Sequence, residues 1–353
     1  MRSSIALALS LSLASVAEAA PGSLEIVEVT GSVLGRGPSE KEFKVMTKGA
    51  TLEPGSRVKT PVGGRARVRY PDGTETVVEE ESEALLDVGS EDQPSSASLF
   101  LGRVWAKVAH ATGSGSSYEV RSANAVAGVR GTVLEVGVGL DGSARVVVDE
   151  GKVVVDGEEG SSNVGAGQLV EASSSGRVGR VSKTPEDRDW SGWFSARAKK
   201  MEAEGLAVAK SLNGRLKTRK TQLKKLIDEQ RGLRREIQAL EKADKRGERG
   251  ARAKLEQKMQ RLERVTARLR SMRSRVEGAF ALFRSWTERT KGLKDGPAIM
   301  AMASDVEKVA AEFADMIEEG TDMSEEGMEE MMDDMKSGKS DRPSKNEMDD
   351  FLK

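Results

Sequence analysis

Residues Ala127–Val136 read AGVRGTVLEV, in which a Val-Arg-Gly-Thr segment lies between glycines and leads into a valine-rich run. Apolar and polar residues alternate in that run, a period of two that is typical of a β-strand. Similar short runs, each bounded by turn residues, recur from Leu24 to Val181: LEIVEV, RARVRY, TETVVEE, RVWAKVA, YEVRS, ARVVVD and KVVVD. We therefore predict that residues 20–182 form an all-β module.

Turn signals between these runs indicate antiparallel hairpins. Pro71-Asp72-Gly73, Asp141-Gly142 and Asp156-Gly157 each place a glycine where a tight turn needs a positive φ. A Gly-x-Val triplet also recurs, beginning at Gly31, Gly102 and Gly151. This recurrence predicts short stacked strands, in a solenoid-like or sandwich-like arrangement.

The hydrophobic period changes near Asp189, and helices are expected from there. Residues 212–240 carry leucine and isoleucine at heptad spacing, with Arg219 and Gln230 interrupting the series, and residues 255–283 form a second such series. Gly247 and Gly250 separate the two, and each glycine costs about 1 kcal/mol inside a helix. We predict an antiparallel coiled-coil hairpin of two helices of about 40 residues over 183–292; one long helix dimerising in parallel is the alternative.

The remaining C-terminal sequence is expected to form one helix and a tail. Asp295-Gly296-Pro297 marks a helix start, so an amphipathic helix is predicted over 293–320. Residues 321–353 are rich in Met, Asp, Glu and Ser, and we predict an acidic, disordered tail.

Charge is segregated along the chain although the formal net charge is only −1. Residues 196–292 carry 29 Lys and Arg against 12 Asp and Glu, whereas residues 293–353 carry 7 against 18. The basic helices are expected to stay soluble as charged coiled-coil flanks, and an anionic surface is a further candidate partner. A coiled-coil homo-oligomer is a third expectation, and no nucleic-acid partner is expected.

The first nineteen residues read as a secretory signal peptide. Arg2 precedes an apolar run of 13 residues, Ile5–Ala17, which is too short for a bilayer core of about 30 Å. Small residues at Ala17 and Ala19 fit a cleavage site after Ala19. A periplasmic location is therefore expected.

Residues that could carry catalysis do not form a recognisable pattern. The chain has no cysteine, and its single histidine, His110, lies at a strand end beside the flexible segment TGSGSS. Adjacent carboxylates such as Glu79 and Glu80 point to opposite faces of a strand. We predict a protein that is not an enzyme, with no catalytic residue, cofactor or metal site.

The order of strands and turns from Leu24 to about Ala172 resembles the FecR domain, which occurs in ferric-siderophore signalling regulators and other envelope proteins. The resemblance rests on LEPGSRVKTPVGGRARVRYPDGTETVVEEESEALLD, LFLGRVWAKV, YEVRSANAVAGVRGTVLEV, ARVVVDEGKVVVDG and VGAGQLVEA. Its most specific pieces are Val129–Thr132, Pro71–Gly73 and Glu150–Val153. FecR regulators place a cytoplasmic segment and a transmembrane helix before this domain, where this chain has the expected signal peptide. They also continue into a small sensing domain, which the helices replace here.

The glycine-bracketed arginine is interpreted as architectural. Gly128 and Gly131 let the backbone turn or pass close to a neighbouring strand, and Arg130 can bind carbonyls or a carboxylate at that turn. Structural or partner-binding roles are accordingly assigned to Pro71, Asp72, Gly73, Gly128, Val129, Arg130, Gly131, Thr132 and Gly151.

The expected function is that of an exported binding or scaffolding protein of the cell envelope. The β-module would recognise a protein or glycan partner, and the coiled coil would set spacing or oligomeric state. The alternative is an envelope signalling component, related to FecR-type regulators, without a transmembrane helix of its own.

Overall fold

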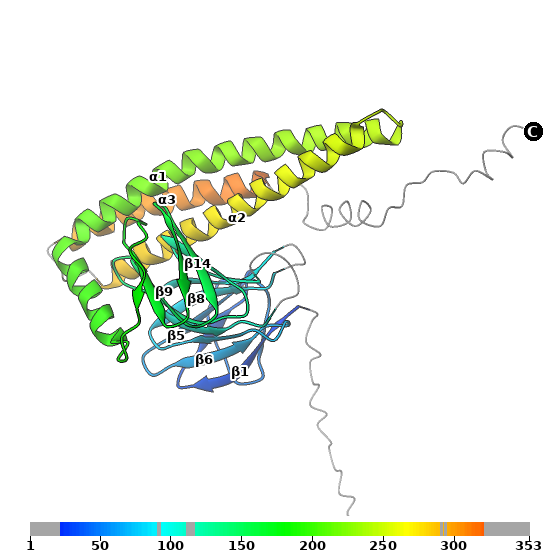
Figure 1. Ribbon diagram of the computed structural model, residues 1–353. Coiled ribbons are helices and arrows are strands. Elements are labelled where there is room, and N and C mark those ends of the chain that lie inside the picture. Colours follow the sequence, from blue (N-terminus) through cyan, green and yellow to red (C-terminus); the bar gives the residue numbers. More distant parts are fainter. Residues whose placement is uncertain (1–21, 90–92, 111–116, 290–291, 293–294, 321–353) are drawn as a thin grey trace, which may run out of the picture. The chain divides into compact units, whose positions relative to one another are not determined.

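The computed structural model describes residues 22–89, 93–110, 117–289, 292 and 295–320. The expected signal peptide and acidic tail therefore lie outside the described residues. Strands fill the first part of this range and helices the second, as predicted (Figure 1). The strands are β1 (Leu24–Thr30), β2 (Leu34–Arg36), β3 (Lys44–Val45), β4 (Thr51–Leu52), β5 (Ser56–Thr60), β6 (Arg65–Arg69), β7 (Glu75–Val78), β8 (Ser82–Asp87), β9 (Ser95–Lys107), β10 (Tyr118–Arg121), β11 (Ala125–Val129), β12 (Val133–Val138), β13 (Ala144–Glu150), β14 (Lys152–Gly157), β15 (Ser161–Gly165), β16 (Gln168–Ala172) and β17 (Ser182–Lys183).

Strand pairing builds two halves that share β9. One half runs β4-β1-β6-β7-β9-β12-β13-β16-β17 and the other β3-β2-β5-β8-β9-β10-β11-β14-β15. All pairs are antiparallel except β9–β10. Residues 95–101 of β9 pair in the second half and residues 102–107 in the first. Gly102, with φ +90°, lies where the strand changes halves, and a Cβ there would be 2.2 Å from the Ser82 Oγ atom.

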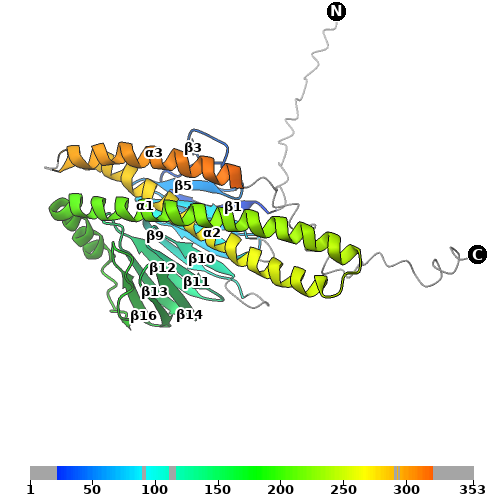
Figure 2. The ribbon, with the colours of Figure 1, turned by 90° about the horizontal axis from the view of Figure 1, so that it is seen from above.

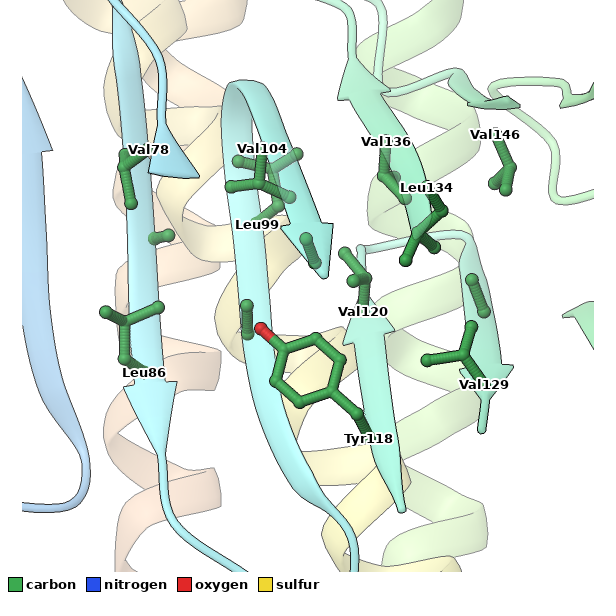
Figure 3. Packing of buried hydrophobic residues seen from close by; sticks show 14 of the residues in the cluster. Val78, Leu86, Leu99, Val104, Tyr118, Val120, Val129, Leu134, Val136 and Val146 are labelled. Carbon is green, nitrogen blue, oxygen red and sulfur yellow. The ribbon is translucent and has the colours of Figure 1, made fainter. Parts of the chain in front are cut away.

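Both halves contribute alternate residues to one hydrophobic core. Val78, Val104 and Leu134 from the first half pack in the same cluster as Leu86 and Leu99 from the second (Figure 3). All five side chains are buried. The period of two in the sequence thus corresponds to a sandwich-like pair of sheet layers, and the sheet is not closed into a barrel.

The helices are α1 (Trp190–Lys245), α2 (Ala251–Arg289) and α3 (Gly296–Gly320). Asp189 caps α1, since its carboxylate accepts a hydrogen bond from the Gly192 N–H at 2.8 Å. α1 has 56 residues, more than the 40 predicted, because it extends back to Trp190. No described helix is both long and apolar enough to cross a membrane.

The contacts divide the chain into two compact units whose limits differ from the sequence-based boundary at residue 182. The first unit contains the strands with residues up to Leu216 and Arg273–Ala303, and the second contains Lys217–Met272 and the residues from Ser304 on. Helical residues are therefore integral to the unit that holds the β-module.

In the second unit α1 and α2 form the predicted antiparallel hairpin (Figure 2). Leu233 and Ile237 of α1 pack in one apolar cluster with Leu255, Met259 and Leu262 of α2. The polar interruption at Gln230 is also buried, and its amide donates to the Thr266 hydroxyl at 3.1 Å. Gly247 and Gly250, which predicted the break, both have positive φ in the connection.

Candidate functional site

The turn between β6 and β7 is built around Asp72. One carboxylate oxygen accepts a hydrogen bond from the Thr74 N–H at 2.9 Å, and the other accepts one from the Thr74 hydroxyl at 3.0 Å. The Gly73 N–H donates to the Tyr70 carbonyl at 3.0 Å, which closes the turn. Asp72 itself is exposed, whereas Thr74 is buried. The turn predicted from Pro71-Asp72-Gly73 therefore also depends on Thr74, whose buried side chain holds the Asp72 carboxylate.

The turn between β11 and β12 needs its second glycine. Gly131 has φ +57°, and a Cβ at this position would lie 2.6 Å from the His110 Cδ2 atom. An alanine would thus combine a left-handed backbone with a steric clash. Val129 lies in the core at the end of β11, and Gly128 pairs with both β10 and β14.

Thr132 connects this turn to the turn between β13 and β14. Its buried hydroxyl lies 3.1 Å from the Arg130 carbonyl and 3.2 Å from the Lys152 carbonyl. Gly151, with φ +83°, passes so close that a Cβ would be 2.8 Å from the Thr132 Oγ atom. Residues from two distant signature segments therefore lie in direct contact.

The end of β9 brings all of these turns to one edge. The Val108 N–H donates to the Thr132 carbonyl at 2.9 Å, and the Ala109 N–H donates to the Thr74 hydroxyl at 3.1 Å. We call the set Pro71–Gly73, Val129–Thr132 and Glu150–Lys152, with His110, the turn edge. Eight of the nine residues singled out from the sequence lie on it, and Gly128 lies directly next to it in β11.

The turn edge carries exposed side chains of both positive and negative charge. Asp72, His110, Arg130, Glu150 and Lys152 are all exposed. The buried threonines below them hold the backbone, so the charged groups are presented by a fixed frame. Such a surface suits recognition of another molecule. Arg130 is thus a surface residue of the turn.

Two buried tyrosines support the edge from inside, and the sequence analysis did not identify them. The Tyr118 hydroxyl lies 2.6 Å from the Thr76 Oγ atom, and the Tyr70 hydroxyl donates to the Ser96 carbonyl at 3.0 Å. Their rings meet edge to face with centroids 5.4 Å apart. Burial raises the pKa of Tyr118 to about 12 and that of Tyr70 well above its usual range. Both hydroxyls therefore stay neutral and act as structural hydrogen-bonding groups.

The opposite end of β12 and β13 is occupied by helical residues of the same unit. The Trp286 indole N–H donates to the Leu140 carbonyl at 2.6 Å, and Trp286 is completely buried. The fully buried Asp141 carboxylate lies 3.1 Å from the Lys200 Nζ atom and accepts a hydrogen bond from the Ser143 N–H at 3.0 Å. We call Leu140–Ser143 with these partners the helix-packed end.

The start of α1 is held on the same sheet half by an aromatic and charged cluster. The Trp190 ring lies below the guanidinium carbons of Arg103 and Arg145, at 5.5 and 5.6 Å from the ring centroid. Glu171 accepts hydrogen bonds from Arg145 at 2.8 Å and from the Trp193 indole at 3.0 Å. These contacts occupy the end of the strands opposite the turn edge, whose charged side chains are exposed.

The ionisable side chains of the turn edge come from separate turns. No group of three or more His, Asp or Glu side chains among the described residues is placed to hold a metal ion. His110 is an exposed residue packed on Gly131, and Ser114 and Ser116 lie outside the described residues. The chemistry that the turn edge can perform is hydrogen bonding and ion pairing with a partner.

Comparisons with known proteins found a family model and solved structures that resemble part of this chain. Residues 56–154 match the family model described as FecR protein, so the chain carries a FecR domain within its strand-rich unit. Two crystal structures from Parabacteroides distasonis ATCC 8503, each described as "a putative anti-sigma factor", match with 21% and 20% identity and TM-scores of 0.32. Both matches cover 39% of this chain, which spans less than two thirds of those chains, 64% and 63%. The search of curated proteins found no match.

Proposed function

We propose that this protein is a non-catalytic, exported partner-binding component of envelope signalling, and that its FecR domain binds a protein through the turn edge. The observation that carries the proposal is the convergence of the three most specific FecR segments on one edge. There, Thr74 and Thr132 are buried anchors, whereas Asp72, Arg130 and Lys152 face solvent. A family-specific sequence that forms a rigid frame for exposed charges is what a recognition surface requires.

A protein partner is favoured over a small ligand because the turn edge is an exposed rim. Its charged groups come from three turns that are distant in sequence, and they carry both signs. Electrostatic complementarity over such a surface gives specificity and faster association with a protein of matching pattern.

Scaffolding is the second candidate function, and the helical hairpin favours it. α1 and α2 have 56 and 39 residues, and paired helices of this length can bind a second partner. Signalling and scaffolding differ in outcome: loss of a signalling component changes transcription of a target set, whereas loss of a spacer changes only assembly.

Photo-crosslinking in envelope extracts tests the binding surface. A photoreactive residue placed at Asp72, Arg130 or Lys152 should yield one common crosslinked species, and one placed at Lys59 should not. Lys59 is an exposed residue near the opposite end of the strands, on β5. In the same assay Arg130→Glu should abolish the crosslink from position 152, and the matched Lys59→Glu should leave it unchanged. Equal crosslinking from all four positions would contradict the proposal.

A further inference from the structure

A basic groove runs along the hairpin in the second unit. It has a volume of about 800 Å³ and is lined by α2, with Glu229 as the lining residue from α1. We call it the basic groove; its principal lining residues are Glu229, Lys258, Arg261, Arg264, Val265 and Arg268. None of the lining residues is aromatic.

The basic side chains share one side of α2 because of their spacing. Lys258, Arg261 and Arg268 recur at three- or seven-residue intervals, which place them on one side of a helix of 3.6 residues per turn. Arg264 lies between Arg261 and Arg268 along the axis and about 40° further around the helix than Arg268. From residue 258 to residue 268 this side of the helix is about 15 Å long.

Two of the four cations are tied to α1. Arg261 donates to the Glu229 carboxylate at 2.7 and 2.9 Å, and Lys258 forms an ion pair with Glu236. No ion pair between described residues involves Arg264 or Arg268, and both side chains are exposed. Lys258 and Arg261 are therefore held by α1, and Arg264 and Arg268 are available to a ligand.

We propose that the basic groove binds the phosphate groups of an anionic lipid surface. Residues 217–272 carry 19 Lys and Arg against 8 Asp and Glu, so a negatively charged partner is attracted to the whole segment. Arginine matches phosphate in a two-pronged geometry. Cations that share one side of a helix over about 15 Å can contact several headgroups of a flat layer at once. Single-stranded nucleic acid would instead call for aromatic side chains on which bases stack.

Vesicle co-sedimentation of the full-length protein tests this assignment. Vesicles of phosphatidylcholine with 30% phosphatidylglycerol are compared with phosphatidylcholine alone, at low and at high salt. Each basic residue near an anionic membrane contributes about a fivefold preference, so Arg264→Gln with Arg268→Gln should lower binding about 25-fold at low salt. High salt should abolish the binding of the wild-type protein.

A matched control removes two charges elsewhere on the hairpin. Lys224 and Arg235 are exposed on α1 and lie about 120–140° around the helix axis from Glu229. Lys224→Gln with Arg235→Gln should lower binding less than threefold. Circular dichroism of all variants shows whether the helices remain folded, and Arg268→Gln alone serves as a milder variant.

Four outcomes would overturn the proposal. Equal losses in the groove and control variants would indicate only general attraction to a basic segment. Equal binding to neutral vesicles would exclude a phosphate-directed contact. Competition by low-millimolar inorganic phosphate would assign the groove to a free anion, and tighter groove-dependent binding of an oligonucleotide would assign it to nucleic acid. Because these residues are separate from the turn edge, failure here leaves the proposed partner binding untouched.

Discussion

Replacing Trp286 tests whether the helix-packed end is part of the folded β unit. The side chain is fully buried, packs edge to face on Phe283 with ring centroids 4.8 Å apart, and donates to the Leu140 carbonyl at 2.6 Å. Truncating a buried tryptophan to alanine costs about 3–5 kcal/mol of the free energy of unfolding. Trp286→Phe keeps most of the apolar contact and removes only the indole donor, which costs about 1–3 kcal/mol when the carbonyl stays buried.

Chemical denaturation followed by far-ultraviolet circular dichroism measures both losses. The expected order of stability is wild type, then Trp286→Phe, then Trp286→Ala, and the alanine variant should melt roughly 6–20 °C lower. A loss below about 1 kcal/mol for Trp286→Ala would refute the reasoning, because the helical segment would then contribute little to the unit that contains the strands.

Three further predictions concern single features of the two units. Gly131→Ala should lower the free energy of unfolding by at least about 1–2 kcal/mol, since its φ is +57° and the new Cβ meets His110; adding His110→Ala should recover only the steric part in thermal melts. Burial raises the pKa of Tyr118 from 10.0 to about 12, so the unfolded chain ionises first and stability should fall as pH rises from about 10 to 12; urea denaturation across that range should show a shallower fall for Tyr118→Phe. Gln230→Leu with Thr266→Val should leave the hairpin as stable as the wild type or make it more stable. Gln230→Leu alone should destabilise it, because the Thr266 hydroxyl then loses its hydrogen-bond partner. Thermal melts of the helices in the wild type and both variants measure the difference.

Local patterns in the sequence predict most of the architecture. The alternation of apolar and polar residues predicts the strands because each strand buries one face. The hairpin turns are predicted by the few residues that adopt a positive φ. The helix break was predictable for the same reason, since Gly247 and Gly250 adopt φ of +73° and +81°. These signals act over a few residues, so they can be read without knowledge of the fold.

Contacts between distant segments could not be predicted in this way. The change of β9 between the two halves depends on one glycine, Gly102, within a 13-residue strand. The pairing of Asp141 with Lys200 joins residues 59 positions apart, and each looks like an ordinary charged residue in its own segment. The length of α1 was underestimated because its first turns pack through tryptophans on the strands, outside the heptad series.

The turn edge was predicted in its parts but not as an assembly. Arg130 is exposed, and Gly131 and Thr132 make the close contacts at this turn, so the architectural role of Arg130 stays a prediction. Thr74 was missed although Asp72-Gly73-Thr74 contains a usable signal, since aspartate commonly accepts a hydrogen bond from the backbone two residues on. The convergence itself requires the end of β9, which no local pattern reveals.

Binding at the turn edge and stability at the helix-packed end can be tested independently, because they depend on opposite ends of β12. The strand begins at Val133 beside the turn edge and ends at Val138 beside the helix-packed end, about 17 Å away at 3.4 Å per residue. Sites that far apart with no shared partner normally contribute additively, within about 0.5 kcal/mol. Arg130→Glu combined with Trp286→Phe should therefore show the summed loss of stability of the single variants, and the loss of crosslinking seen for Arg130→Glu alone. A deviation above about 1 kcal/mol in denaturation would mean that the strands transmit strain between the ends, and the partner site would then be coupled to the packing of the helices.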